Sequence, residues 1–126
     1  MASLRAVTRS FGDELKEQQE VLALVADILI DLSTTESVWL RAQKLRATQS
    51  EEKSSVPRDI ATLYARDASN RIAVNASNLA GALACRKADR EVWECAQRLA
   101  TQPPIDTVSL RQNISDALIS AGRFIW

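Results

Sequence analysis

Apolar side chains recur every three or four residues from Ala2 to Leu45 of this 126-residue chain. This spacing predicts amphipathic helices, and no segment shows the alternation typical of a β-strand. A polar patch at 16–19 separates two apolar stripes. We therefore expect two helices, over about residues 2–16 and 19–47, rather than one long rod. The residues predicted to be buried on these stripes are Leu4, Val7, Phe11, Leu15, Leu22, Val25, Leu29, Leu32, Trp39 or Leu40, and Leu45.

A polar stretch follows the second predicted helix and separates it from a third. Residues 48–55 hold no large apolar side chain, so they are predicted to form a solvated loop. Pro57 suits the first turn of a helix, with Ser54 or Ser55 as its cap. The third helix is then expected to run from about Pro57 to Ala84. Its regularly placed alanines would allow a neighbouring helix to approach closely.

Capping and helix-breaking residues define two further helices. Asp89 can cap a short helix that ends before Pro103-Pro104. Asp106 or Thr107 can cap the last helix, and Gly122 can supply its left-handed stop. The predicted fold is therefore all-α: an antiparallel, up-and-down four-helix bundle with one short extra helix. We expect it to form a single domain over all 126 residues.

The amino-acid composition excludes several classes of catalytic site. The chain has no His, the side chain that titrates nearest neutrality and the commonest metal ligand. Ser-His-Asp triads, Cys-His pairs and HExxH zinc sites are therefore excluded. Cys85 and Cys95 lie ten residues apart, fit no redox or zinc motif, and are predicted to be reduced structural thiols.

The charge balance limits the classes of binding partner. Lys and Arg number 16, and Asp and Glu number 16. No net field therefore attracts nucleic acid or an anionic membrane. We expect a cytoplasmic protein with no nucleic-acid partner and at most weak membrane contact, whose binding depends on shape and apolar surface.

Two carboxylates stand four residues apart on the most apolar predicted helix. Asp27 and Asp31 share one face, and paired carboxylates often serve acid–base or metal chemistry. A buried charge also needs a partner, which Arg66 and Arg71 of the third helix could provide. We expect this structural ion-pair role and no catalytic or metal-binding residue. A small-molecule site that also uses the hydroxyls of residues 33–35 is the weaker alternative.

Three large apolar residues follow the predicted stop at Gly122. Phe124, Ile125 and Trp126 have no later segment in the sequence to cover them. Either they fold back onto the bundle or they form a contact with another surface, and the sequence leaves both open. They are the candidate interface residues.

The run from Glu17 to Leu32 contains Ala-Asp and Ile-Asp-Leu, and Glu36-Ser37 and the segment 40–44 (Leu-Arg-Ala-Gln-Lys) follow it. This pattern resembles the C-terminal helical region of acyl-CoA dehydrogenases of the very-long-chain type and their bacterial relatives. Residues 66–76 and 106–124 match that region in spacing. The resemblance thus covers nearly the whole chain and contains no catalytic motif.

The resemblance implies a role without chemistry of its own. In that family, upstream domains hold the FAD and the acyl-CoA thioester and supply the catalytic glutamate, so this chain would hold no cofactor and would not be an enzyme alone. Its implied partners are the catalytic domains of an acyl-CoA dehydrogenase or a second copy in a homodimer. The alternative is a stand-alone helical adaptor or assembly protein that binds a partner helix in a groove.

Overall fold

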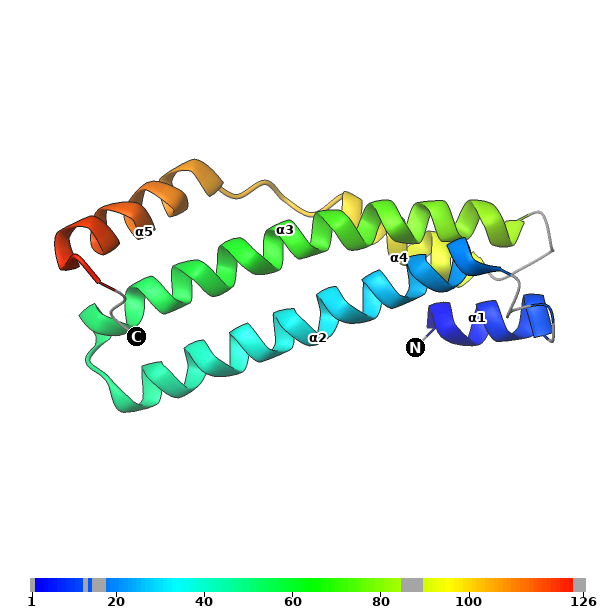
Figure 1. Cartoon of the computed structure of the whole chain (residues 1–126). Helices are drawn as coiled ribbons and strands as arrows, with labels where there is room; N and C mark the ends of the chain where they lie inside the picture. The colour runs from blue at the N-terminus through cyan, green and yellow to red at the C-terminus, as the bar shows by residue number, and fades with distance from the viewer. Residues whose placement is uncertain (1, 13, 15–17, 85–89, 124–126) are drawn as a thin grey trace. The chain divides into compact units, whose positions relative to one another are not determined.

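The computed structural model describes residues 2–12, 14, 18–84 and 90–123. Within these residues the chain forms five α-helices and no β-strand (Figure 1). The all-α prediction is therefore confirmed, as is the division of the first apolar stretch into two helices. The helices are α1 (Ala2–Phe11), α2 (Gln19–Thr48), α3 (Glu51–Ala84), α4 (Arg90–Ala100) and α5 (Thr107–Ala121).

The chain divides into two compact units. Unit 1 comprises Met1–Leu32 and Ala68–Gln102, and unit 2 comprises Ser33–Asp67 and Pro103–Trp126. Because α2 and α3 each contribute to both, unit 1 contains α1, the first part of α2, the second part of α3, and α4. Unit 2 contains the remaining parts of α2 and α3 together with α5.

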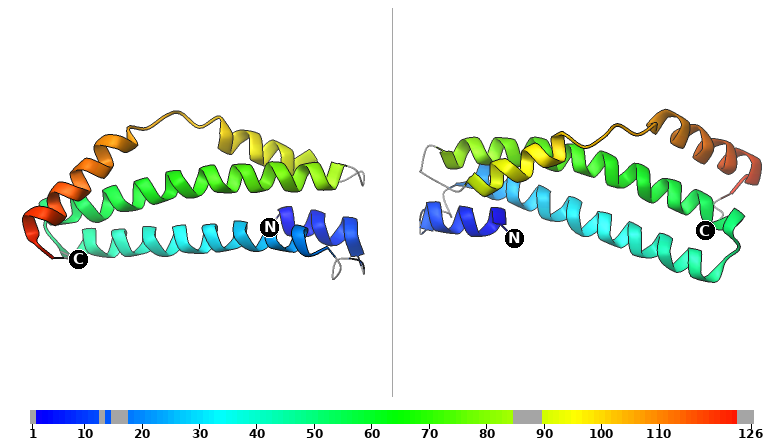
Figure 2. Two further views of the ribbon diagram at one scale, coloured as in Figure 1. Left: turned by 45° about the horizontal axis from the view of Figure 1, so that its top comes forward. Right: turned by 180° about the vertical axis from the view of Figure 1, so that it is seen from behind.

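Unit 1 holds a hydrophobic core to which four helices contribute. Leu79 and Leu83 of α3 are 0% and 1% exposed, and Val92 of α4 is 1% exposed. Small residues on α3 permit the close packing that the sequence predicts, since Ala76 is also buried in this cluster. Helix α1 contacts α4, and α4 lies beside the second part of α3 in both views of Figure 2. The core consists of Val7, Phe11, Val21, Val25, Ile28, Ile72, Ala76, Leu79, Leu83, Val92 and Ala96.

The buried side of α2 in unit 1 differs from the predicted one. Leu22 and Leu29 are 39% and 43% exposed, and Leu32 is exposed as well, so their placement in the core was wrong. This helix carries apolar residues on more than one side, and a stripe displaced by one residue lies about 100° around the helix. Val25 is buried as predicted, and Val21 and Ile28 are buried in place of the three leucines.

Two predicted helix boundaries were also wrong. Helix α1 ends at Phe11 rather than near residue 16, because Gly12 adopts a φ of 50° that favours glycine. The predicted loop over residues 48–55 is mostly helical, since α3 begins at Glu51 and contains Pro57. Glu51 is therefore the first residue of α3 and not part of a preceding loop.

Unit 2 buries few apolar side chains. Among its described residues, only Ala42, Leu45, Pro57 and Ala61 are buried, and α5 has no buried residue. The apolar side chains of α5 are half-buried at Leu110, Ile114 and Leu118, whereas Val108 and Ile119 are exposed.

Both predicted ends of α5 are confirmed. Asp106 is the N-cap, with its carboxylate accepting hydrogen bonds from the Ser109 backbone N–H at 3.0 Å and from Ser109 Oγ at 2.6 Å. Gly122 has a left-handed φ of 62° and donates its N–H to the carbonyl of Leu118 at 3.0 Å. Helix α5 is therefore defined by its caps more than by burial.

Candidate functional site

The carboxylate of Asp31 and the guanidinium of Arg71 form an ion pair between α2 and α3 within unit 1. Arg71 Nη2 donates to Asp31 Oδ1 at 2.6 Å, and Arg71 Nε donates to Oδ1 and Oδ2 at 3.1 and 3.2 Å. The Asp31 side chain is 12% exposed and the Arg71 side chain is 48% exposed. This two-pronged geometry fixes the carboxylate against an always-charged guanidinium, which indicates a structural role for Asp31.

Asp27 and Arg66 are the other two residues that were predicted to form ion pairs. Asp27 is exposed, and none of the described residues forms an ion pair with it. Arg66 lies in unit 2, where its Nη2 donates to the carbonyl oxygen of Pro103 at 2.6 Å. Of the four residues, Asp31 and Arg71 are the pair that the described contacts bring together. An exposed Asp27 needs no cation beside it, because water solvates its charge.

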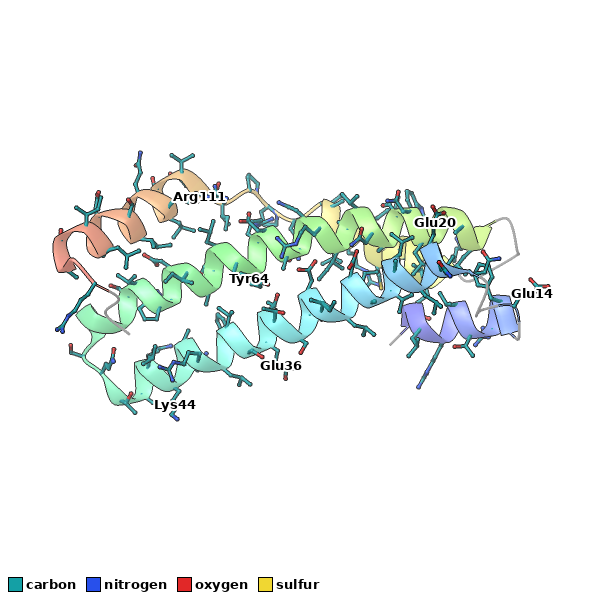
Figure 3. The ribbon with its side chains drawn as sticks, in the orientation of Figure 1. Glu14, Glu20, Glu36, Lys44, Tyr64 and Arg111 are labelled. Atoms are coloured by element: carbon teal, nitrogen blue, oxygen red, sulfur yellow. The ribbon has the colours of Figure 1, made fainter. Side chains whose placement is uncertain are left out.

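A second ion pair joins α5 to α3 in unit 2. Arg111 Nη2 lies 3.2 Å from Asp67 Oδ2, and both side chains are largely exposed. Figure 3 labels Arg111 on α5. Together with the Arg66–Pro103 hydrogen bond, this pair secures the segment before α5 and its first turns. The sequence did not indicate either contact, since each joins residues about forty positions apart with no local signature.

The pKa of the Asp106 carboxyl lies below its ordinary value. The largest cause is the hydrogen bond from the Ser109 hydroxyl, followed by the one from the Ser109 backbone N–H. Both stabilise the ionised form, as expected at a helix N-cap. This perturbation therefore reflects the cap and gives no sign of a catalytic acid.

Unit 2 contains an open apolar pocket of about 300 Å³ between α2 and α3. Leu45 and Pro57 are buried at its wall, and Arg41 is exposed beside it. The sequence patterns did not indicate this pocket, because Pro57 was expected at a helix start and not inside a helix that faces α2. The residues that line the pocket are Ser37, Val38, Arg41, Ala42, Leu45, Pro57 and Ile60.

One hydroxyl of the serine- and threonine-rich turn of α2 bonds to the backbone of its own helix. The Ser37 hydroxyl donates to the carbonyl oxygen of Ser33 at 2.9 Å, one turn earlier in the same helix. This back-bonding satisfies the hydroxyl within α2. Ser37 is exposed although it contributes to the pocket.

Large apolar side chains are exposed in both units. In unit 1, Leu22, Leu29 and Leu32 of α2 lie on one side of the helix at spacings of seven and three, and each is more than one-third exposed. In unit 2, Trp39 of α2 is 48% exposed. Leu40 is 59% exposed, so the expectation that Trp39 or Leu40 is buried was wrong, and Trp93 of α4 is 47% exposed as well.

The described residues also bear on the remaining predictions. Within residues 2–12, 14, 18–84 and 90–123, no three His, Cys, Asp or Glu side chains gather as a metal site would require. No described helix is long and apolar enough to cross a membrane. Cys95 is a free thiol, whereas Cys85 and the candidate interface residues Phe124, Ile125 and Trp126 lie outside the described residues.

The chain was compared with models of known protein families. The family model of the acyl-CoA dehydrogenase C-terminal domain matches residues 1–93. These residues include α1, α2, α3 and the start of α4. A comparison with curated protein sequences finds no match.

Proposed function

Because this chain belongs to the acyl-CoA dehydrogenase C-terminal domain family, we propose that it is a non-catalytic accessory bundle. It packs against the catalytic domains of an acyl-CoA dehydrogenase-like flavoenzyme or against a second copy of itself. In this proposal the helices form one antiparallel, up-and-down bundle that works in the cytoplasm. FAD and the acyl-CoA substrate belong to the catalytic domains and not to this chain.

The apolar side of α2 in unit 1 is the observation that carries the proposal. Leu22, Leu29 and Leu32 remain 39%, 43% and 49% exposed while Val25 and Ile28 of the same helix are buried. A helix with apolar residues beyond its core-facing side is typical of one that is covered on more than one side. Leucines at this spacing can pack into the grooves of a facing helix.

The chemistry of the described side chains supports a non-catalytic role. Asp31 is held by Arg71, and the perturbed Asp106 carboxyl serves as a helix cap. We expect the purified protein to be colourless and to lack dehydrogenase activity. A flavin absorption spectrum that persists through gel filtration would contradict this part of the proposal.

The packing role can be tested by mixing the protein with the flavin-containing core of an acyl-CoA dehydrogenase that lacks its own C-terminal bundle. We expect light scattering to detect either a complex with this core or a homodimer of the chain. Leu29→Glu should abolish that association, because it places a charge on the apolar side of α2. The matched control is Val74→Glu, at a 61% exposed position on α3.

The control separates loss of an interface from a general effect of added charge. Both variants should keep the helical circular dichroism of the wild type, because both positions are exposed. Failure of the wild type to associate with the core or with itself would overturn the proposal. So would equal loss of association in the two variants.

A further inference from the structure

The apolar pocket between α2 and α3 in unit 2 is a feature that the proposed function leaves unexplained. Its wall combines buried Leu45 and Pro57 with half-buried Val38 and Ile60. Ligand pockets in proteins start at about 300 Å³ and are mostly apolar, with a few polar groups that orient the ligand. A cavity of about 150 Å³ already accommodates a benzene ring. The volume of about 300 Å³ therefore leaves room for a chain of about eight carbon atoms.

The charged residue that lines this pocket is Arg41. It is exposed, and none of the described residues forms a hydrogen bond or an ion pair with it. Its side chain can therefore turn towards a bound anion without breaking a contact in the described part of the chain. A guanidinium is always charged and binds a carboxylate through two parallel hydrogen bonds. The other polar lining residue, Ser37, already donates its hydroxyl to the carbonyl of Ser33 at 2.9 Å.

The charges near the pocket favour an anionic ligand. No carboxylate is found among the described residues that line it. On the α2 side, residues 37–48 contain three basic side chains and no acidic one. On the α3 side, Asp59 already has a cation beside it, since Arg58 Nε lies 3.9 Å from Asp59 Oδ1. A surface lined by one sign of charge raises the local concentration of ions of the opposite sign.

We propose that this pocket binds a small amphipathic carboxylate, whose apolar body lies against the pocket wall and whose carboxylate pairs with the guanidinium of Arg41. The apolar body gains free energy by leaving water. The ion pair selects an anion over a neutral or cationic compound of the same length. Because unit 2 buries few apolar side chains of its own, a ligand that covers this wall should stabilise the unit. This binding is separate from the packing role proposed above.

The test compares octanoate, 1-octanol and octylammonium, which share one chain length and differ in charge. Each is titrated into the full ¹⁵N-labelled chain below the concentration at which it forms micelles. The amide shifts of Val38, Ala42 and Ile60 report binding at the pocket. We expect octanoate to bind about two- to fivefold more tightly than 1-octanol, as a solvent-exposed ion pair allows, and octylammonium to bind most weakly.

Two pairs of variants separate the charge from the apolar wall. Arg41→Gln should remove the preference for octanoate and leave the binding of 1-octanol unchanged. Its matched control is Lys44→Gln, which removes the same charge at an exposed position outside the pocket lining and should keep the preference (Figure 3). Ala42→Leu fills the pocket from its wall and should abolish the shifts with both compounds. Its matched control is Ala47→Leu, at an exposed position of α2.

Several results would overturn the proposal. They are the absence of binding by the wild type, equal affinities for octanoate and 1-octanol, and shifts confined to the exposed leucines of unit 1. Equal responses within either pair of variants would overturn it as well. Circular dichroism must show the helix content of the wild type. If Ala42→Leu fails to fold, Ile60→Gln takes its place, because a polar wall should weaken the binding of both compounds. No dehydrogenase core is present in the titration, so its result is independent of the proposed function.

Discussion

The two units of the molecule are held together in different ways. Unit 1 gathers side chains from four helices into one buried cluster, in which Val7 and Leu79 are fully buried. Unit 2 buries four residues among those described and relies on polar contacts and caps, such as Arg66 with Pro103 and Arg111 with Asp67. The difference shows that two units to which the same two helices contribute can differ in how completely they bury their apolar side chains.

This difference has an energetic consequence. Burial of apolar surface is the main stabilising contribution in folded proteins, whereas an exposed ion pair contributes little. We therefore expect unit 1 to determine the free energy of global unfolding. Unit 2, and α5 in particular, should open locally at a lower free energy.

The largest expected difference comes from the same substitution placed in each unit. Leu79→Ala removes a fully buried side chain of unit 1, which should lower the free energy of unfolding by about 2–5 kcal/mol. Leu110→Ala, at a half-buried position of α5, should cost about 1 kcal/mol or less. Urea unfolding followed by circular dichroism measures both. Equal losses would show that the two units are equally well packed.

The interhelical ion pair of unit 1 should also contribute more to stability than the interhelical ion pair of unit 2. Arg71→Ala removes the guanidinium that binds the nearly buried Asp31, and we expect a loss of about 1–2 kcal/mol after allowing for the exposure of Arg71. Arg111→Ala should cost about 0.5 kcal/mol or less, because both members of its pair are exposed to solvent. Double-mutant cycles with Asp31→Asn and Asp67→Asn measure the coupling energies. A larger coupling energy for the Asp67 pair than for the Asp31 pair would contradict the expected difference between the units.

The same substitution can be made at a glycine with positive φ in each unit, Gly12 in unit 1 and Gly122 in unit 2. A Cβ at Gly12 or Gly122 meets no atom within 4 Å. The cost of alanine should therefore be conformational only, about 1 kcal/mol at each site. Because α1 contributes to the core of unit 1, Gly12→Ala should lower global stability, whereas Gly122→Ala should increase amide exchange only in α5. Hydrogen exchange read by NMR separates the two results, and a global loss in Gly122→Ala would contradict the expectation.

The smallest expected effect is a pH-dependent loosening of α5. The pKa of Asp106 is lower in the folded chain than in the unfolded chain, where Asp titrates near pH 4. The stabilisation is therefore present above about pH 4 and is lost as the pH falls through the lowered pKa of the folded state. The NMR shift of the Ser109 amide should follow this titration, while the amides of unit 1 do not. Asp106→Asn keeps a capping side chain and should remove the titration; persistence of the titration would assign it to another group.

The sequence predicted several helix ends correctly, because each of these ends depends on side chains that lie next to it. The cap at Asp106, the stop at Gly122 and the start of α2 at Gln19 follow from side chains next to the boundary, so the sequence sufficed. The end of α1 was missed although Gly12 was available as a signal. The early start of α3 was missed because Pro57 was assigned to a first turn, whereas the helix continues through it.

The choice of buried side on α2 could not be made from that helix alone. Leu22 and Val21 differ by one position, both are apolar, and only the facing helices decide which of them is covered. The same reasoning applies to the candidate site. The closeness of Asp31 and Arg71, forty residues apart, depends on the register of α2 against α3. Periodicity does not specify that register.

Native-state hydrogen exchange can compare the two units within one sample, because it reports the stability of each helix separately. We expect the slowest amides, which exchange only through global unfolding, to lie in the second part of α3 and in α4. The amides of α5 should exchange at least about tenfold faster, equivalent to roughly 1.4 kcal/mol or more. Equal protection of α5 and these unit 1 helices would contradict the account.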